Sequence, residues 1–564
     1  MALRLITGRS GQGKTEYLVQ EVIRLSMENP QQKYYVIVPE QFSLEMQRKM
    51  VKKHPRHGFF NIDVLSFHRL AYRIFDECGY QPGEILEDLG VSMMLRKILS
   101  EGENNFLYFK KSMKKAGFID ELKSMLMEFI GYGVTWEQVE EVSEKLGENK
   151  ALSNKCKELG RIYEHFDKAI EGRFMVTEQI LDVAREFAKE APMLTNAVFY
   201  FDGFAGFTPV QLAFLKELLK VAGQINVTIT IPEFVPGQRG MPEDLFTSSK
   251  KTGDALLMLC QENMQEVEEV VKLDTPVSPR FINNPELAFL EKNLFQNSRK
   301  IYSKKIERIH MTVCHNPDGE ADYVMHKIEQ LVRQKGYRYR DFAVLSGDVA
   351  DYASAFKRKA AILNIPVFED TKKKVSYHSG VEAVRSLFHL AQMEYSYESV
   401  FRYLKSGMSN LIDEDADYLE NYVLYAGVRG YSMWKKPFYR RLKNKDEAAI
   451  KALLLLQEKF MEETENFCSV MRDKEASVRD KIEVLYHTMV KLSFEEKLKN
   501  QAQKAEENSD FVKAAEYRQL YDLLLSLMDK IVMIFGEEKM AVKELAEIVD
   551  AGLDALGLGV VPLT

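Results

Sequence analysis

Cysteine, tryptophan and long apolar runs are scarce in this chain. Its 564 residues include five cysteines and two tryptophans, and no two cysteines form a C-x-x-C pair. This predicts neither a disulfide framework nor a zinc or iron–sulfur ligand set. No apolar run approaches the ~20 residues of a membrane helix, and the N-terminal MALRLITGRSGQGKT lacks the pattern of a secretory signal. We therefore expect a cytoplasmic protein that does not span a membrane.

An excess of positive charge is also missing. Lysine and arginine total 77 against 84 acidic residues, so the net charge is −7, and 46% of the residues are hydrophobic. These numbers exclude a bulk polycation that grips nucleic acid by average charge. A local basic groove stays possible in principle, because net charge averages over all faces. The apolar fraction is that of a globular protein, and the length predicts three or four domains.

The first part of the chain has the pattern of a parallel sheet. Between its third and fourth strand candidates lie about 130 residues, from 67 to 197, that read almost entirely as helix. Strands alternating with helices predict right-handed crossovers in an α/β fold. We expect a sheet domain formed by residues 1–78 and 192–290, interrupted by a helical insertion at 79–191. The predicted strands are 3–7, 34–38, 60–67, 197–202 and 225–231.

A second strand group is predicted further along. Segments 309–314 and 341–347 flank an amphipathic stretch at 320–334, which is the pattern of a βαβ unit. We expect a second, incomplete sheet domain at 291–375. From 376 to 564 the chain reads as a helical insertion that ends in the apolar run GLGVVPLT, as a truncated insertion would.

A glycine-rich segment directly follows the first predicted strand. It matches G-x-x-x-x-G-K-[ST] at every fixed position, and a helical pattern follows it. Glycines let successive backbone N–H groups turn toward phosphate oxygens, the lysine supplies a charge for the β- and γ-phosphates, and the threonine hydroxyl can ligate Mg²⁺. The segment predicts binding of ATP with Mg²⁺, without saying what the binding is for. Its residues are Gly8, Arg9, Ser10, Gly11, Gln12, Gly13, Lys14 and Thr15.

The acid that would hold this Mg²⁺ is expected at the end of a neighbouring strand. Asp202, which closes AVFYFD, is the best candidate, with a turn or helix-cap role as the alternative. The next residue, Gly203, has no carboxylate, and no second acid follows in the loop. Loss of a general base slows a reaction by ~10²–10⁴-fold and leaves phosphate and metal contacts intact. The sequence thus predicts a site that binds ATP or ADP and hydrolyses ATP slowly or not at all.

Several segments together resemble one protein family. GRSGQGKT, VIVPEQFSLEMQ and VLSFHRLA resemble the opening of superfamily 1 DNA helicases. YFDGFAGFTPVQ, YHSGVEAVRSLF and DYLENYVLYAGVRGYSMW look more specifically like the B subunit of the AddAB ATP-dependent helicase–nuclease, and the resemblance covers the whole chain. It implies two RecA-like P-loop domains with large all-helical insertions. It also implies a heterodimer whose other half, the A subunit, is the motor, and which works in repair and recombination at DNA double-strand breaks.

The chain departs from the active helicases that it resembles. Their second motif reads Asp-Glu, whereas Asp202 is followed here by Gly203, with Thr208 and Gln211 near the polar residues downstream of that motif. No adenine-contacting glutamine motif precedes the P-loop. After FAVL, where active relatives place an arginine, the chain reads Ser346-Gly347-Asp348. Each departure weakens the case for motor activity.

Two loops are predicted to contact DNA. In helicase-like cores a single strand crosses the C-terminal ends of the strands, held by phosphate contacts and stacking. Gln41 and Phe42 follow the second predicted strand, and Ser66 and His68 follow the third. The alternative is that Phe42 and Phe67 belong to the core and that His68 is a turn residue.

The predicted function is a nucleotide- and DNA-binding helicase-like region that is weak or inactive as a motor. It would hold single-stranded DNA and duplex ends while the A subunit drives translocation. The enzyme alternative is an active single-stranded DNA translocase whose activating carboxylate comes from elsewhere. A small-molecule kinase would be a compact single domain, and an interaction scaffold would bind no nucleotide. By resemblance, an iron–sulfur cluster is expected only in a nuclease domain beyond Thr564, and none of the five cysteines matches its ligands.

Overall fold

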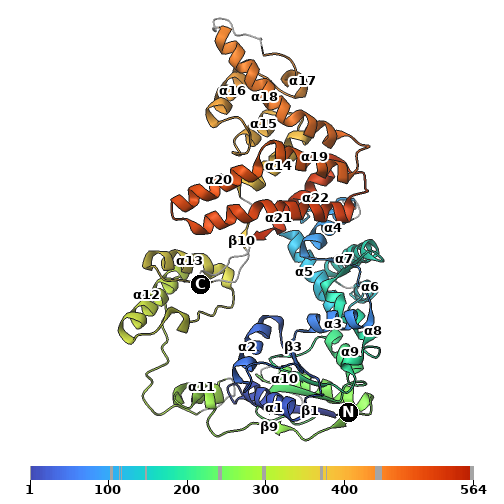
Figure 1. Ribbon diagram of the computed structural model, residues 1–564, viewed down its shortest axis with the longest axis vertical. Coiled ribbons are helices and arrows are strands. Elements are labelled where there is room, and N and C mark those ends of the chain that lie inside the picture. Colours follow the sequence, from blue (N-terminus) through green and yellow to red (C-terminus); the bar gives the residue numbers. More distant parts are fainter. Residues whose placement is uncertain are drawn as a thin grey trace. The chain divides into compact units, whose positions relative to one another are not determined.

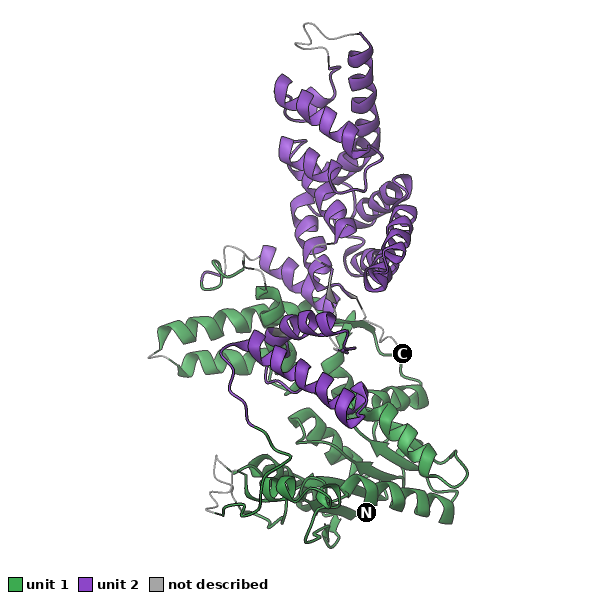
Figure 2. Cartoon of the chain, turned by 90° about the vertical axis from the view of Figure 1, so that its left-hand side faces the viewer, with its two compact units in different colours: residues 1–87, 108–310 green, residues 88–107, 311–564 purple. Residues whose placement is uncertain are grey.

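The computed structural model divides the chain into two compact units (Figure 2). Unit 1 comprises residues 1–87 and 108–310, and unit 2 comprises 88–107 and 311–564. The described residues are 2–101, 106–113, 115, 117–146, 149–238, 244–294, 300–368, 373–375, 378–438 and 447–558.

A parallel sheet forms the centre of unit 1 (Figure 1). Its strand order is β3-β2-β6-β7-β1-β8, and β9 also pairs with β1. All of these pairs are parallel, so the connections between strands are crossovers and the carboxyl ends of the strands meet at one edge. The strands are β1 (Ala2–Gly8), β2 (Tyr34–Ile37), β3 (Ile62–Leu65), β6 (Val198–Phe201), β7 (Gln224–Thr230), β8 (Glu266–Val267) and β9 (Val271–Lys272). The five strands predicted up to residue 231 are confirmed.

Helices cover both faces of this sheet. On one face α1 (Lys14–Glu28) and α2 (Ser43–Lys53) bury side chains such as Val22 and Met50 against β2 and β3. On the other face lie α3 (Phe67–Cys78), α8 (Ile180–Phe187), α9 (Pro209–Leu218) and α10 (Thr247–Glu262). The strands are apolar on both sides because both sides are covered. This is the expected α/β architecture with a parallel sheet.

A helical insertion separates β3 from β6, as predicted. It contains a second, two-stranded parallel sheet, in which Glu84 pairs with Phe174 and Leu86 with Val176. Its further elements in unit 1 are β4 (Glu84–Leu86), α5 (Phe118–Gly131), α6 (Trp136–Lys145), α7 (Lys150–Ile170) and β5 (Phe174–Val176). Helix α11 (Pro285–Asn293) follows the sheet near the end of the unit.

Unit 2 is mostly helical. Helix α4 (Asp88–Glu101), which falls within the predicted insertion at 79–191, packs in this unit against α22 (Val542–Ala555). Lys97 Nζ in α4 donates to Glu538 Oε2 at 2.6 Å, just ahead of α22. The other helices are α12 (Pro317–Lys335), α13 (Val349–Leu363), α14 (Ser379–Gln392), α15 (Tyr397–Leu404), α16 (Asp413–Ala426), α17 (Tyr431–Trp434), α18 (Glu447–Arg472), α19 (Val478–Lys491), α20 (Phe494–Glu507), α21 (Phe511–Phe535) and α22 (Val542–Ala555). The predicted helical character of 376–564 is therefore confirmed over its described residues, and the finer domain boundaries stay predictions.

The predicted βαβ unit is confirmed only in its helix. Helix α12 covers the amphipathic stretch, but neither 309–314 nor 341–347 forms a strand, although all of these residues are described. Met311, Val313 and Leu345 are more than nine-tenths exposed. A strand forms where a neighbour takes up its backbone hydrogen bonds, and within the described residues no strand lies beside either segment. In the described residues of unit 2, the strand pair that forms joins β10 (Lys373–Lys374) to β11 (Gly557–Leu558).

Among the residues that the structure describes, no helix combines the length and the apolar composition needed to cross a bilayer. This agrees with the absence of long apolar runs in the sequence.

Candidate nucleotide and nucleic-acid sites

The loop from β1 to α1 has the backbone that the glycine pattern predicts. Gly11 and Gly13 have φ values of 78° and 89°, in the left-handed region where a side chain causes strain. A Cβ on Gly11 would also lie 2.6 Å from Ser278 Oγ. Helix α1 begins at Lys14, directly after Gly13, so its unpaired N-terminal N–H groups face the loop. The local sequence therefore produces a turn of left-handed glycines at a helix N-terminus, a geometry that suits an anion.

Lys14 lies inside this turn. Its Nζ donates to the carbonyl oxygens of Gly8 at 2.8 Å and Arg9 at 3.1 Å. Burial lowers the pKa of Lys14 to about 8; Asp202 opposes this shift and Arg280 adds to it. A bound phosphate would place negative charge beside the ammonium and so favour its protonated form. The ammonium is therefore placed to bind an anion.

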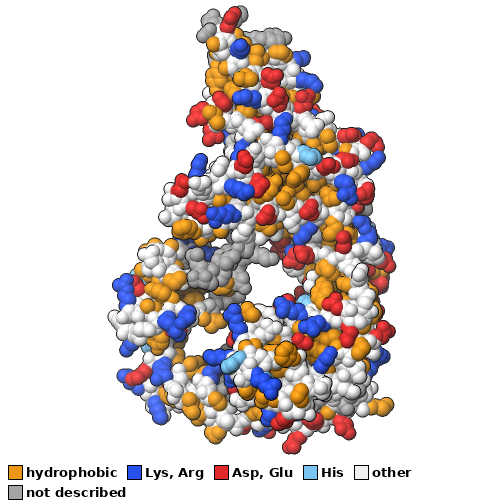
Figure 3. All heavy atoms as spheres, viewed as in Figure 1, with side chains coloured by type: hydrophobic (Ala, Val, Ile, Leu, Met, Phe, Trp, Pro, Cys, Tyr) orange, Lys and Arg blue, Asp and Glu red, His pale blue; other side chains and the backbone are white. Residues whose placement is uncertain are grey.

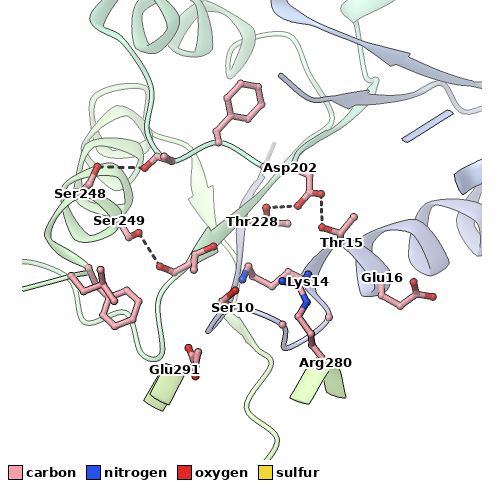
Figure 4. Close-up of a pocket in the computed structure, with 18 of the residues that line it drawn as sticks. Ser10, Lys14, Thr15, Glu16, Asp202, Thr228, Ser248, Ser249, Arg280 and Glu291 are labelled. Atoms are coloured by element: carbon pink, nitrogen blue, oxygen red, sulfur yellow. Dashed lines mark hydrogen bonds between the residues drawn. The ribbon is translucent and has the colours of Figure 1, made fainter. Parts of the chain in front are cut away.

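Asp202 and Thr15 meet although they are far apart in the sequence. Thr15 Oγ1 donates to Asp202 Oδ2 at 2.7 Å, and Thr228 Oγ1 in β7 donates to Asp202 Oδ1 at 2.6 Å (Figure 4). Asp202 is 5% exposed and follows the end of β6. A hydroxyl and a carboxylate at this distance are the oxygen ligands that Mg²⁺ prefers, with phosphate oxygens completing the shell. The donor set fits the predicted metal, and the metal role of Asp202 stays a prediction.

The backbone at Gly203, the position after Asp202, is unfavourable for a residue with a carboxylate side chain. Gly203 has φ of 82°, and a Cβ there would lie 3.5 Å from Cδ of Pro39. Any L-residue at this position would adopt a strained left-handed conformation. The difference from an Asp-Glu motif is therefore one of backbone conformation as well as of side chain.

Two other carboxylates line the same cavity, and both are paired with cations. Glu16 interacts with Lys49 and Lys53. Glu291 accepts from Arg9 Nε at 2.9 and 3.1 Å, and its main-chain oxygen accepts from Arg9 Nη2 at 2.6 Å. Neither carboxylate is free to polarise a water beside a terminal phosphate. Apart from Asp202, the described lining thus provides no available general base.

The cavity is large enough for a nucleotide. Its volume is about 780 Å³, within the range of small-molecule sites. Its lining combines charged and hydroxyl side chains with the apolar side chains of Phe204, Leu245, Phe246 and Leu294. The Arg9 guanidinium lies 5.5 Å from the centre of the Phe246 ring. The charged and hydroxyl groups suit phosphates, and the apolar side chains suit a base.

Arg280 is a functional candidate that the sequence did not predict. It lies in a short 3-10 helix (Pro279–Phe281), lines the cavity and approaches Lys14 (Figure 4). It is a single cation in a loop 266 positions after Lys14, with no motif around it. Only the tertiary structure brings this cation into the cavity lining, where Lys14 and Lys49 are the other cations.

The predicted DNA-contacting loops lie on the same edge of the sheet as the nucleotide cavity. Gln41 and Phe42 belong to a 3-10 turn (Glu40–Phe42) just after β2, and both are exposed. His68 is at the start of α3, just after β3, and its Nδ1 lies 3.6 Å from Glu40 Oε2. Because β2 and β3 pair in parallel, the structure brings the two loops together.

Ser66 and Phe67 have structural roles in this loop. Ser66 is buried, and its hydroxyl accepts a hydrogen bond from the Arg69 backbone N–H at 3.4 Å as the N-cap of α3. Phe67 is 6% exposed and packs against Phe201, so the core alternative holds for it. Phe42, in contrast, is 44% exposed. Gln41, Phe42 and His68 are thus accessible to a ligand, whereas the Ser66 hydroxyl is already engaged.

Thr208 and Gln211 also have a local explanation. Gln211 Oε1 accepts from the Thr208 backbone N–H at 2.9 Å, and Thr208 Oγ1 accepts from the Gln211 backbone N–H at 3.3 Å. This reciprocal pair is a capping box at the start of α9. Their resemblance to a helicase motif therefore coincides with a helix-start signal.

Comparison with known proteins identifies the family. Residues 5–291 match the family described as "ADDB, N-terminal". The chain is 32% identical to the B subunit of the ATP-dependent helicase/deoxyribonuclease of Lachnoclostridium phytofermentans, over 100% of this chain and 50% of that protein. The proteins of the same name from Thermoanaerobacter sp. (strain X514) and Clostridium botulinum (strain Hall) are 32% and 30% identical, over 100% of this chain and 49% and 50% of theirs. The chain thus spans about half the length of these curated relatives, and it belongs to the AddB family, to whose N-terminal region the match corresponds.

Proposed function

We propose that the chain binds ATP with Mg²⁺ and DNA as part of an ATP-dependent helicase–nuclease, and that it does not itself drive translocation. The relatives' name, the B subunit of a helicase/deoxyribonuclease, supports a DNA substrate and the presence of a second, partner chain. A separate motor, the A subunit, would then supply the ATP-driven movement at DNA double-strand ends.

One observation carries this proposal. Thr15 and Asp202 are arranged to hold Mg²⁺, but the next residue is Gly203 in a left-handed conformation, and the other two lining carboxylates are paired with cations. The site can therefore grip a triphosphate without a group to activate water. Gln41, Phe42 and His68 lie at the carboxyl ends of β2 and β3, where helicase-like cores bind DNA. We expect these residues to contact single-stranded DNA there.

ATP hydrolysis in the presence of single-stranded DNA tests the proposal. We expect micromolar binding of a fluorescent ATP analogue with Mg²⁺ but turnover near background, with or without DNA. Brisk DNA-stimulated turnover that disappears in Lys14→Ala would favour the active translocase instead. An absence of nucleotide binding would favour a scaffold.

A further inference from the structure

The chain around α2 has an unusual local charge. Between Glu45 and Asp63 it contains five lysines and arginines, two histidines and no acidic residue, in a protein whose net charge is −7. In the view of Figure 3, Lys and Arg side chains gather over the part of unit 1 where Figure 1 labels α2. A local concentration of this kind indicates an anionic ligand.

The five cations fall into two groups. Lys49 and Lys53 turn toward Glu16 of α1 and form ion pairs with it. Arg48, Lys52 and Arg56 are exposed, and their side chains have no hydrogen bond or ion pair with any described residue. Fold stability therefore does not account for the second group.

Exposed apolar side chains accompany these three cations. Leu44 and Val51 are 58% and 39% exposed, and Phe60, in the turn before β3, is fully exposed. On a helix, positions 44, 48, 51 and 52 share one face. We call this face, together with Arg56 and Phe60 of the following turn, the α2 face. The one acid on the helix, Glu45, lies in its first turn.

We propose that the α2 face binds the backbone and bases of a single-stranded nucleic acid that passes over Gln41 and Phe42. The inference rests on the proposed function and extends it by a second surface. Residues Gln41 and Phe42 directly precede α2, so the face begins where the predicted DNA loop ends. The 11 residues of α2 give a length of about 16 Å at ~1.5 Å per residue. That length matches roughly five phosphates of a stacked strand.

The mixture of side chains favours a single strand over a folded protein partner. Single-strand sites combine cations that follow the phosphates with aromatic or apolar side chains on which bases stack. The three unpaired cations and Phe60 supply both kinds of contact. An acidic protein surface would use the cations but would gain little from one fully exposed phenylalanine.

Salt-dependent DNA binding tests the inference. The 564-residue chain and its triple variant Arg48→Ala/Lys52→Ala/Arg56→Ala would be titrated into a fluorescein-labelled oligo(dT) of about 20 nucleotides, long enough for one site. Each phosphate contact with a single strand contributes about 0.7 to the slope of log K against log salt, so three contacts should lower the slope by about 2. At 100 mM salt we expect affinity to fall on the order of tenfold or more.

A matched control distinguishes a site from general charge. The triple variant Lys150→Ala/Lys157→Ala/Arg161→Ala removes three cations from α7 and should keep the slope and the affinity. Phe60→Ala should weaken binding about fivefold through lost stacking and leave the salt slope unchanged. Retained Mg²⁺–ATP binding and an unchanged melting temperature would show that each variant is folded.

The outcomes separate this inference from the proposed function. If the unaltered chain binds no oligonucleotide, the proposed DNA binding itself fails. If the unaltered chain binds and the α2 triple variant binds equally with the same slope, only the α2 face is rejected as a nucleic-acid site, and an acidic protein partner becomes the better explanation. An equal loss in the α7 control would also overturn the inference.

Discussion

The loop after β1 and the loop after β6 meet at one cavity but present different chemistry to it. The first supplies left-handed glycines, Lys14 and the start of α1, which are the groups that the proposed phosphate binding needs. The second supplies Asp202 for a metal and then Gly203, whose backbone has φ of 82°. In the proposed function, binding a nucleotide and activating water are therefore separable, because they depend on different loops. Changes to either loop test this separation.

The largest effect is expected from Lys14→Ala in the first loop. It removes the ammonium that would face the β- and γ-phosphates, and charged hydrogen bonds of this kind contribute about 1.5–3 kcal/mol. Affinity for Mg²⁺–ATP should fall about 100-fold, measured by titration with a fluorescent analogue. Unchanged affinity would show that the cavity is not the nucleotide site.

The second loop should control only the metal-dependent part of binding. Asp202→Asn removes the charge that would balance Mg²⁺, so ATP affinity should fall about tenfold with Mg²⁺ and change little in EDTA. Thr228→Val is the matched control, because it removes the hydrogen bond to Asp202 Oδ1 but keeps the carboxylate. An equal loss with and without Mg²⁺ would contradict a metal role for Asp202.

Nucleotide affinity should depend on pH through Lys14. Its pKa of about 8 means that it loses its proton as the pH rises through 8, and phosphate binding needs the protonated form. Affinity should therefore be highest below pH 8 and fall about tenfold between pH 7 and pH 9. The residual affinity of Lys14→Ala should lack this dependence, and a flat profile in the unaltered chain would show that Lys14 does not bind phosphate.

Arg280→Ala sharpens the comparison from outside both loops. Arg280 lines the cavity and its charge acts on Lys14, so its loss should weaken ATP binding about fivefold, and ADP binding less because ADP carries less charge. Arg280→Lys keeps the charge and should lose less. Equal losses for ATP and ADP would place Arg280 away from the terminal phosphate.

The smallest effect is expected from Gly203→Glu, which would place a carboxylate directly after Asp202. Gly203→Glu should leave ATP hydrolysis near background, because a left-handed backbone would not aim the side chain as an Asp-Glu motif does. The strain should lower the free energy of unfolding by about 1–2 kcal/mol, measured by denaturant titration. Gly203→Ala is the control for strain alone. A large gain in turnover would show that only the side chain was missing.

The local features of the fold could be predicted, and the non-local ones could not. The strands up to residue 231 and the helices after 378 follow from hydrophobic periodicity within short windows. The same reasoning failed at 309–314 and 341–347, where the strand pattern is present but no neighbouring strand pairs with it in the described part of the chain. It also gave no sign of β8 and β9, because two-residue edge strands exist only through their pairing with β1.

The candidate site divides in the same way. The phosphate loop is contiguous, so its residue types alone determine a turn of left-handed glycines at a helix start, and the sequence was enough to predict it. Three features depend on segments that folding brings together: the contact of Thr15 with Asp202, the arrival of Arg280, and the pairing of Glu16 and Glu291 with cations. Such contacts form only when the sheet and its crossovers are assembled. The sequence by itself therefore determined the glycine-rich turn and the lysine on which the proposed phosphate binding rests, and the tertiary structure decided which other charges surround them.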